Sequence, residues 1–486
     1  MKNIEKTNKK TNNHLKGFYI SAFKRNSGKT TISVALSRLL RDKGFLVQPF
    51  KKGPDFIDPM WLSRASGRAC YNLDFYFMPS SKIKKHFNTR SLNSDISVVE
   101  GNHGLHDSFE VRGLTSNASM AKLLGLPVIL VVDVNELNRG VIPLLLGFQD
   151  FDRDVKIKGV ILNKVHSKRH EKNLNKAINY YTNFKVVGNI PKDNGISIKQ
   201  RHLGLFSTMS EGDIENRIFD IALKVKDSID LDSIIKIAGI RKMPEISGDS
   251  LPAYAPFFQE VSKEIKSRKG KNGIKIGLAY DNAFNFYYNE NIEALEALGC
   301  EIVRFSPLRD EKLPGVDAAY IGGGFPEILC RELEANINFR KDLAGKIENG
   351  LPVYAECGGL MYLCKGMSFN DESCDMVGAI DAHVKLTKKP KGHGYTKLSP
   401  VNYGKNGSKW FDKIKFIKGH EFHHSYLETV EENLNLSFDV IKGYGVNGFK
   451  DGISRKNLYA SYTHMYSPSS PGWFRNWVSF IKALKP

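Results

Sequence analysis

One cysteine in the second half of the chain stands in the setting of a nucleophile. Cys357 follows the apolar segment LPVYAE and precedes two glycines and the segment LMYL. A strand, a sharp turn and a helix in that order expose a thiol beside backbone amides, which lower its pKa and stabilise an oxyanion. We therefore predict that Cys357 is a catalytic nucleophile and that the Gly358 amide contributes to an oxyanion hole. The alternative is a buried structural cysteine, which the flanking glycines disfavour.

A nucleophilic thiol needs a general base, and the chain offers one near its C-terminal end. The segment LYASYTHMY contains His464. The segment YIGGGFPE reads as a strand that ends in a glycine run, so the amides of Gly323 and Gly324 are expected to complete the oxyanion hole. Position 466, two residues beyond the histidine, is Tyr466 and not a carboxylate, so no third member of a catalytic triad is visible.

A second candidate site lies near the other end of the chain, in the segment SGKTT. It follows a strand-like run and opens a helix-like one, an order typical of a phosphate-binding loop, whose amides, lysine and hydroxyl hold phosphates and magnesium. The full pattern needs a glycine where the chain has Phe23, so a chance GKT at a helix start is the alternative. The residues predicted to bind the nucleotide are Ser27, Gly28, Lys29, Thr30, Thr31 and Asn163. Asn163 is included only because of its position after a strand-like run, and it is expected to contact the adenine.

Four carboxylates follow the strand-like runs after this loop. Asp55 and Asp58 lie in the segment KKGPDFIDP, Glu100 ends the run SVVE, and Asp107 comes shortly after it. Ligands bind at the carboxyl ends of the strands in open α/β sheets, so these side chains are expected over one edge. We assign Thr30, Asp55 and Glu100 to magnesium, and Asp58 and Asp107 to the site of phosphoryl transfer. The alternative for any one carboxylate is a solvated loop position.

Strand-like and helix-like runs alternate through most of the chain, which is the rhythm of parallel sheets covered by helices. The rhythm lapses between about residues 235 and 273, and a second set of strand-like runs then begins. We therefore predict an α/β protein of two domains. The expected boundaries are a basic tail at 1–16, a first domain at 17–235, a linker at 236–273 and a second domain at 274–486.

The composition limits the class of protein and its partners. A chain of 486 residues with 41% hydrophobic and 25% charged residues is typical of a folded soluble protein. The longest apolar stretch, at 123–134, is too short for a membrane helix, and the first residues lack a secretory signal. Six cysteines without a CxxC pair are expected to be reduced thiols in the cytoplasm. The net charge of +19 suits a polyanionic partner or only reflects an abundance of lysine. Neither nucleic acid nor a membrane is expected as a partner.

The segment HEFHH at 420–424 satisfies the HExxH pattern of zinc proteases. That pattern requires a helix which presents both histidines on one face, together with a third ligand. The neighbouring segment KIKFI is strand-like and no helix is evident, so a zinc site is not expected here.

Several segments, in this order, resemble the cobyrinate a,c-diamide synthase family: SGKTT, QPFKKGPDFIDP, GRACYNLDFYF, VVEGNHGLHD, GVILNKVHS and RHLGL. The element DNAFNFYYNEN at 281–291 is similar to one found in the same branch, and it implies that Asp281 and Tyr287 belong to the acceptor site. Cys357, His464 and the glycine turns look like a class I glutamine amidotransferase. The resemblance implies a dethiobiotin-synthetase-like P-loop domain followed by a flavodoxin-like amidotransferase domain. It also implies a phosphate loop without the first glycine and a Cys–His pair.

The resemblance implies an amidoligase that uses ATP, Mg²⁺ and L-glutamine. ATP would activate the a and c carboxylates of a tetrapyrrole polycarboxylate, and ammonia released from glutamine would pass through a closed interface to form the amides. Two alternatives stay open. The same chemistry acts on sirohaem, sirohydrochlorin or Ni-sirohydrochlorin, or the chain is a partitioning-type regulatory ATPase without glutaminase activity. A homodimer is possible.

Overall fold

The computed structural model describes residues 16–196, 198, 211–241, 273–369, 372–401, 409–411, 413–429 and 434–485. Three predictions fall wholly or mainly outside these residues: the basic tail, the RHLGL segment and most of the linker. The last helix before that linker, α9, ends at Ile237, and the next strand, β8, begins at Lys275.

The first unit is built on a seven-stranded sheet with the order β3-β2-β4-β1-β5-β6-β7. Every pairing in it is parallel, as the alternation of strand-like and helix-like runs predicts. The strands are β1 (Gly17–Ala22), β2 (Val47–Lys52), β3 (Tyr71–Leu73), β4 (Ile96–Glu100), β5 (Val128–Asp133), β6 (Ile157–Val165) and β7 (Val186–Pro191).

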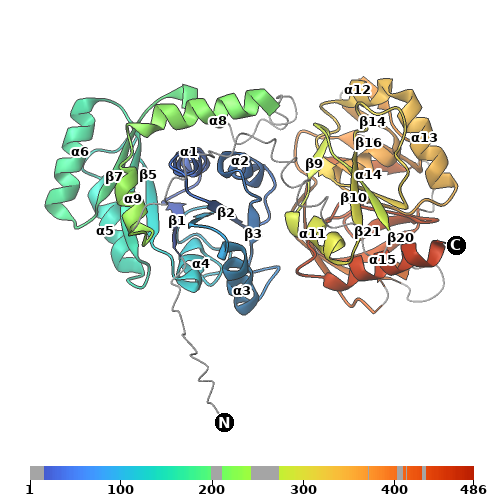
Figure 1. Ribbon diagram of the computed structural model, residues 1–486, viewed down its shortest axis with the longest axis horizontal. Helices are drawn as coiled ribbons and strands as arrows, with labels where there is room; N and C mark the ends of the chain where they lie inside the picture. The colour runs from blue at the N-terminus through green and yellow to red at the C-terminus, as the bar shows by residue number, and fades with distance from the viewer. Residues whose placement is uncertain are drawn as a thin grey trace, which may run out of the picture.

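Helices cover both faces of this sheet (Figure 1). Alternate residues of β1 point to opposite faces, so Phe18 and Ile20 pack in one core and Tyr19 in the other. The helices are α1 (Lys29–Asp42), α2 (Ile57–Ser66), α3 (Ser80–Ser91), α4 (Asn117–Leu124), α5 (Val141–Phe151), α6 (Lys168–Tyr181), α8 (Glu211–Lys226) and α9 (Leu231–Ile237), with a 3-10 turn at Asn194–Ile196. Helices α1, α8 and α9 pack on the Phe18 side, and α3 to α6 on the Tyr19 side.

The second unit contains a ten-stranded mixed sheet with the order β10-β8-β11-β13-β22-β21-β20-β17-β18-β23. Its first five strands are parallel: β10 (Glu301–Phe305), β8 (Lys275–Ala279), β11 (Ala318–Ile321), β13 (Val353–Glu356) and β22 (Leu458–Ser461). The antiparallel remainder is β21 (Lys450–Arg455), β20 (Leu436–Lys442), β17 (Gly392–Pro400), β18 (Ile417–His423) and β23 (His464–Met465).

In the described residues of the second unit, two smaller sheets and five helices accompany this sheet. The first sheet pairs β9 (Phe284–Phe286) with β12 (Gly323–Gly324). The second has the order β15-β14-β16-β19, with bounds Glu372–Asp375, Cys364–Phe369, Ile380–Leu386 and Ser425–Thr429. The helices are α11 (Asn289–Ala297), α12 (Cys330–Ala335), α13 (Ile337–Glu348), α14 (Gly358–Leu363) and α15 (Pro471–Leu484), with a 3-10 turn at Lys409–Phe411. The two-domain α/β fold is thereby confirmed.

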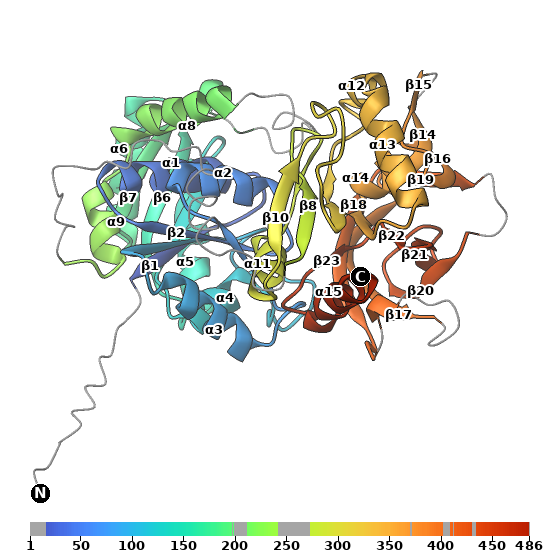
Figure 2. The ribbon, with the colours of Figure 1, turned by 45° about the vertical axis from the view of Figure 1, so that its right-hand side comes forward.

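The two units meet along the β3 edge of the first sheet, which faces α11 of the second unit (Figures 1 and 2). The Tyr71 hydroxyl donates to Glu293 at 2.6 Å, and the Asn72 amide donates to Glu290 at 3.2 Å. Farther along, the Tyr395 hydroxyl donates to Asp74 at 2.6 Å. Buried aromatic residues of both units share one apolar core beside these bonds. The docking is therefore held by buried polar contacts as well as by apolar packing.

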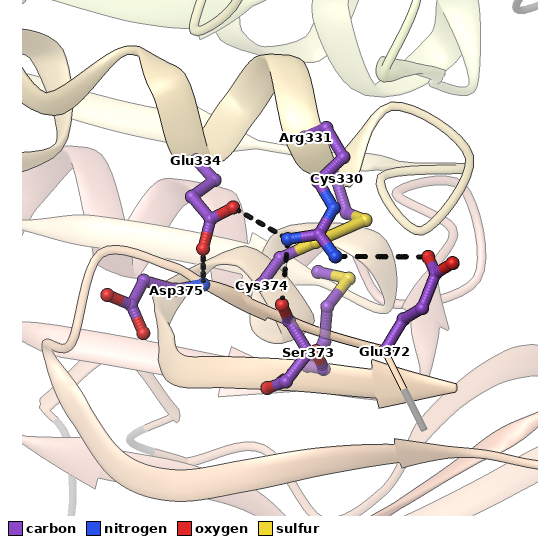
Figure 3. Close-up of a disulfide and its surroundings, with 8 residues drawn as sticks. Cys330, Arg331, Glu334, Glu372, Ser373, Cys374 and Asp375 are labelled. Atoms are coloured by element: carbon purple, nitrogen blue, oxygen red, sulfur yellow. Dashed lines mark hydrogen bonds and ion pairs between the residues drawn. A yellow bond between two sulfur atoms is a disulfide. The ribbon is translucent and has the colours of Figure 1, made fainter. Parts of the chain in front are cut away.

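A disulfide joins Cys330, at the start of α12, to Cys374 in β15 (Figure 3). The neighbouring Arg331 guanidinium donates to Glu334 and to the Ser373 carbonyl, each at 3.0 Å. The expectation that all six cysteines are reduced is therefore wrong for this pair. The spacing of 44 residues carried no signal, because the fold alone brings the two segments together.

No helix in the described part of the chain is both long and apolar enough to cross a membrane.

Candidate active site

The phosphate loop is held in shape by the side chain predicted to read the adenine. Gly28 precedes α1 with a φ of +92°, and a Cβ at this position would collide with the Asn163 side chain. Asn163 Nδ2 donates to the Ser27 carbonyl at 2.8 Å, and Ser27 Oγ donates to the Lys24 carbonyl at 2.9 Å. In this structure Asn163 anchors the loop from the end of β6, while adenine recognition by this residue stays a prediction.

Lys29 and Thr30 follow Gly28 at the start of α1, where helix amides are available to a phosphate. Lys29 is 5% exposed, and burial together with the nearby Lys51 ammonium lowers its pKa to about 8. Thr30 Oγ1 donates to Glu100 Oε1 at 2.8 Å, which links the loop to the end of β4. Thr31 lies on the same helix turn and is also buried.

The structure brings three of the four predicted carboxylates together around a lysine that the sequence analysis did not select. Lys51 Nζ lies 2.5 Å from Asp58 Oδ2, 2.8 Å from Glu100 Oε1 and 3.9 Å from Asp55 Oδ2. Lys51 is 3% exposed, at the end of β2. Asp107 is exposed, and its carboxylate accepts from the Gly104 amide at 2.8 Å.

The surroundings shift the pKa values of the clustered carboxylates in different directions. Burial and the adjacent Asp58 carboxylate raise the pKa of Asp55 to about 7. Burial would also raise the pKa of Asp58, but the Lys51 ammonium outweighs that effect and lowers it. Burial raises the pKa of Glu100. Groups whose pKa values are driven apart in one cluster are typical of sites that do chemistry.

The surroundings of Glu100 fit a magnesium ion that arrives with a nucleotide. Glu100 Oε2 is buried and accepts no hydrogen bond, and the Thr30 hydroxyl lies on the other carboxylate oxygen. In the described residues no three His, Cys, Asp or Glu side chains form a metal site by themselves. Mg²⁺ is usually held by one or two carboxylates together with phosphate oxygens and water.

Cys357 lies at a strained turn between β13 and α14. Its φ of +46° and ψ of −101° are unusual for a residue with a Cβ. The two glycines that follow permit this turn to pack closely, since a Cβ on Gly359 would collide with the Ile321 carbonyl and one on Gly358 would lie 3.1 Å from the Gly324 amide nitrogen. The cysteine turn and the glycine run therefore lie against each other, as the oxyanion-hole prediction requires.

His464 lies over the same glycine run. A Cβ on Gly323 would collide with His464 Cε1, so any other residue at this position would displace the imidazole. His464 is paired with His420 in the β18–β23 ladder, and the two rings stack at 5.0 Å. Cys357 Sγ lies 3.9 Å from the carbonyl oxygen of Phe422, two residues farther along β18. The cysteine turn and the imidazole thus both border β12 and β18.

A carboxylate accompanies His464, although the sequence showed none two residues beyond it. Glu356, the residue before the nucleophile, has Oε2 3.5 Å from His464 Nδ1, and both side chains are almost fully buried. Glu356 accepts hydrogen bonds from the Tyr320 hydroxyl at 3.0 Å, from the Met465 amide at 2.9 Å and from the Tyr354 hydroxyl. Only the fold brings this carboxylate to the imidazole, because 108 positions separate the two residues.

Burial opposes the predicted lowering of the thiol pKa by the neighbouring amides. Burial raises the pKa of Cys357, the Glu327 carboxylate raises it further, and the hydrogen bond of the Gly358 amide offsets only part of this. Burial raises the pKa of Glu327 itself to about 7. Deprotonation of the thiol therefore requires a base, which makes the neighbouring His464 more important than the sequence suggested.

Asp281 and Tyr287 are engaged inside the second unit. Asp281 accepts from the Ala283 amide at 2.8 Å and from Ser306 Oγ at 2.8 Å. The Tyr287 hydroxyl donates to the Ala279 carbonyl at 2.5 Å and accepts from the Gly322 amide at 2.8 Å, so it supports the glycine run. Contact of these two residues with an acceptor stays a prediction.

The HEFHH segment forms the end of β18, not a helix. Glu421 accepts from the amides of Tyr444 at 2.5 Å and Gly445 at 2.8 Å, and His423 Nε2 lies 3.5 Å from Glu421 Oε2. The zinc pattern requires its two histidines one helical turn apart, an arrangement that a strand does not provide.

The fold and the two sites define a glutamine-dependent amide-forming ligase with its own nucleotide-binding domain. Residues 18–205 match the family model described as the CobQ/CobB/MinD/ParA nucleotide binding domain. Residues 275–471 match the model of the CobB/CobQ-like glutamine amidotransferase domain.

More specifically, the chain belongs to the cobyrinate a,c-diamide synthase family. It is 38% identical to the cobyrinate a,c-diamide synthase of Magnetococcus marinus over 94% of this chain and 95% of that one. It is 38% identical to the protein of that name from Methanosarcina barkeri, over 92% of each chain. The Picrophilus torridus protein of the same name is 39% identical, over 93% of this chain and 96% of its own. The family resemblance noted in the sequence is thereby confirmed.

Proposed function

We propose that this chain converts the a and c acetate carboxylates of cobyrinic acid into amides, with ATP as the energy source and glutamine as the nitrogen donor. The observation that carries the proposal is the presence of two complementary sites in one chain. Lys29 and Thr30 meet a carboxylate cluster in the first unit, and a cysteine turn meets a histidine and a glycine run in the second.

In the second unit, glutamine hydrolysis follows from the geometry. His464 takes the proton of the Cys357 thiol, and the thiolate attacks the side-chain amide of glutamine. The amides of Gly358, Gly323 and Gly324 stabilise the oxyanion, and His464 returns the proton to the departing ammonia. Water then cleaves the thioester to give glutamate and the free thiol. The buried Glu356 carboxylate, 3.5 Å from His464 Nδ1, stabilises the protonated form of the imidazole.

In the first unit, a carboxylate must be activated, because hydroxide is a poor leaving group. The carboxylate attacks the γ-phosphate of ATP, which forms an acyl phosphate and ADP. Ammonia then displaces inorganic phosphate and leaves the amide. Lys29 would stabilise the transferring phosphoryl group, and Asp58 and Lys51 would orient the reacting carboxylate. Thr30, Glu100 and Asp55 would hold Mg²⁺ together with the phosphates, and the ion would neutralise the charge of the phosphoryl group.

The choice of acceptor rests on family membership and not on a contact in the structure. A net charge of +19 suits a substrate with many carboxylates. Sirohaem, sirohydrochlorin and Ni-sirohydrochlorin present similar acetate groups and remain alternatives. A homodimer and a cytoplasmic location stay predictions. The alternative from another class, a partitioning-type regulatory ATPase, would not explain the cysteine turn and its histidine.

The test is a screen of these four tetrapyrroles with the purified enzyme, ATP, Mg²⁺ and glutamine, read by mass spectrometry. The proposal predicts a diamide from cobyrinic acid and one glutamate released per amide formed. If a sirohydrochlorin derivative is amidated instead, that compound is the acceptor and the assignment of cobyrinic acid is wrong. Absence of both amidation and glutaminase activity would favour the regulatory ATPase.

A further inference from the structure

A side chain of the first unit reaches the glutaminase site of the second. The ring of Phe56 is 7% exposed, and its centroid lies 5.0 Å from that of His464. It also lies 5.2 Å from His420, 4.6 Å from Tyr288 and 5.3 Å from Phe286, with which it is stacked. Each of these four partners belongs to the second unit, so Phe56 is a bridge between the proposed glutaminase site and the first unit.

The backbone of Phe56 belongs to the proposed phosphate site. Phe56 stands between Asp55 and Asp58 and precedes the first residue of α2. Asp55 Oδ1 accepts from the amides of Ile57 at 2.9 Å and Asp58 at 3.2 Å, which holds the turn that carries the ring. Asp58 in turn is bound by Lys51. A nucleotide or metal that draws Asp55 or Asp58 toward itself must therefore move Phe56 as well.

The position of His464 depends on what surrounds its ring. Gly323 lies against its Cε1 edge, His420 stacks on it at 5.0 Å, and Phe56 contacts it from the first unit. His420 is itself tied to the Tyr288 hydroxyl, 2.9 Å from its Nδ1. Of these neighbours, Phe56 alone is attached to a loop of the nucleotide-binding unit. A shift of that loop changes the packing of the imidazole that deprotonates Cys357.

The same ring lies among apolar side chains between the two sites. Phe56 and Phe286 stack, and Phe286 meets Phe325 edge-on at 5.0 Å. An aromatic lining of this kind excludes water and disfavours the charged ammonium ion relative to neutral ammonia. A ring in this place can therefore act as a barrier as well as a mechanical link.

We propose that Phe56 couples the two half-reactions of this enzyme. In this structure the ring packs on His464 and on the apolar cluster that it shares with Phe286. When Asp55 and Asp58 engage Mg·ATP and the acceptor, the ring shifts, His464 becomes competent and ammonia can pass. Phe56 is thus a positioning residue that acts through His464. This inference rests on the proposed function, because it assigns the control of the same two sites.

The test compares Phe56→Leu with a matched control, Phe77→Leu. Phe77 is also a buried phenylalanine of the first unit at the same interface, and it packs 4.9 Å from Tyr466 and 5.8 Å from Tyr395. In the described part of the chain its aromatic neighbours are tyrosines, among them Tyr288, and not the catalytic pair. For each variant, glutamate release and amide formation are measured in parallel, with and without ATP and the acceptor. Phe56→Tyr, which keeps the ring, serves as the conservative rescue.

Wild type is expected to release about one glutamate per amide, and its glutaminase activity is expected to rise with ATP and the acceptor. Phe56→Leu is expected to raise the glutamate-to-amide ratio severalfold and to abolish the response to ATP, while Phe56→Tyr and Phe77→Leu keep both. A Phe56→Leu enzyme that keeps the wild-type ratio and response would overturn the inference, as would equal uncoupling by Phe77→Leu. Failure of the proposed function is a different result, because wild type itself would then form no amide.

Discussion

The substitution Gly323→Ala adds one methyl group beside the imidazole, and it should impair the glutamine-dependent reaction without impairing the ATP-dependent one. The Cβ of Gly323→Ala would come about 1 Å closer to His464 Cε1 than the 3.4 Å at which ordinary van der Waals contact begins. The imidazole cannot easily retreat, because His420 and Phe56 pack against it. A displacement of about 1 Å in a catalytic group costs about 100-fold in rate, or about 2.7 kcal/mol of transition-state stabilisation. Glutamine-supported kcat/KM should fall by about this factor.

The measurement is amide formation with glutamine and, separately, with ammonium salt as the nitrogen source. Ammonia-supported amidation should be retained, because ammonia added as a salt does not depend on the thiol or on the imidazole. The matched control is Gly345→Ala in α13, where a new Cβ would meet nothing within 4 Å, and neither activity should change. The reasoning is refuted if Gly323→Ala keeps wild-type glutamine kcat/KM, or if both nitrogen sources lose activity equally.

Three further predictions address other parts of the molecule. Glu356→Gln should lower glutamine-supported kcat/KM at least about tenfold and spare the ammonia reaction, since the amide removes the charge beside His464. Because burial and Lys51 lower the pKa of Lys29 to about 8, the binding of a nucleotide near pH 8.5 should restore the charge of Lys29 and take up a proton. Calorimetry in two buffers of different ionisation enthalpy would show this uptake, and Lys29→Arg should abolish it. Cys330→Ser should lower the free energy of unfolding of the oxidised protein by about 2–4 kcal/mol, and not that of the reduced protein. Equal urea midpoints of the oxidised variant and oxidised wild type would contradict this.

Local patterns in the sequence were sufficient to predict the strands and helices that carry the proposed catalytic residues. The SGKTT and AECGG segments each combine a strand, a turn and the start of a helix within about a dozen residues, so residue types alone report the geometry. Their predicted strands and helices agree with β1, α1, β13 and α14. The parallel first sheet followed in the same way from alternating apolar runs.

The residues that the sequence analysis missed depend on contacts between distant segments. Lys51 looked like one basic residue among many until β2 and β4 placed it between Asp58 and Glu100. Glu356 was overlooked because the carboxylate of a triad was sought after the histidine and not before the cysteine. Phe56 was read as part of a motif, and its contact with His464 requires both units to be docked. Side chains whose role depends on a partner far along the chain give no local signal.

The central claim is that Cys357 supplies ammonia to a carboxylate activated at Lys29. The most direct measurement is amide formation by Cys357→Ser and Lys29→Ala with glutamine and with ammonium salt. Cys357→Ser should lose the glutamine reaction and keep the ammonia reaction, while Lys29→Ala should lose both. Loss of both reactions in Cys357→Ser, or amide formation by Lys29→Ala, would contradict the division of labour between the two units.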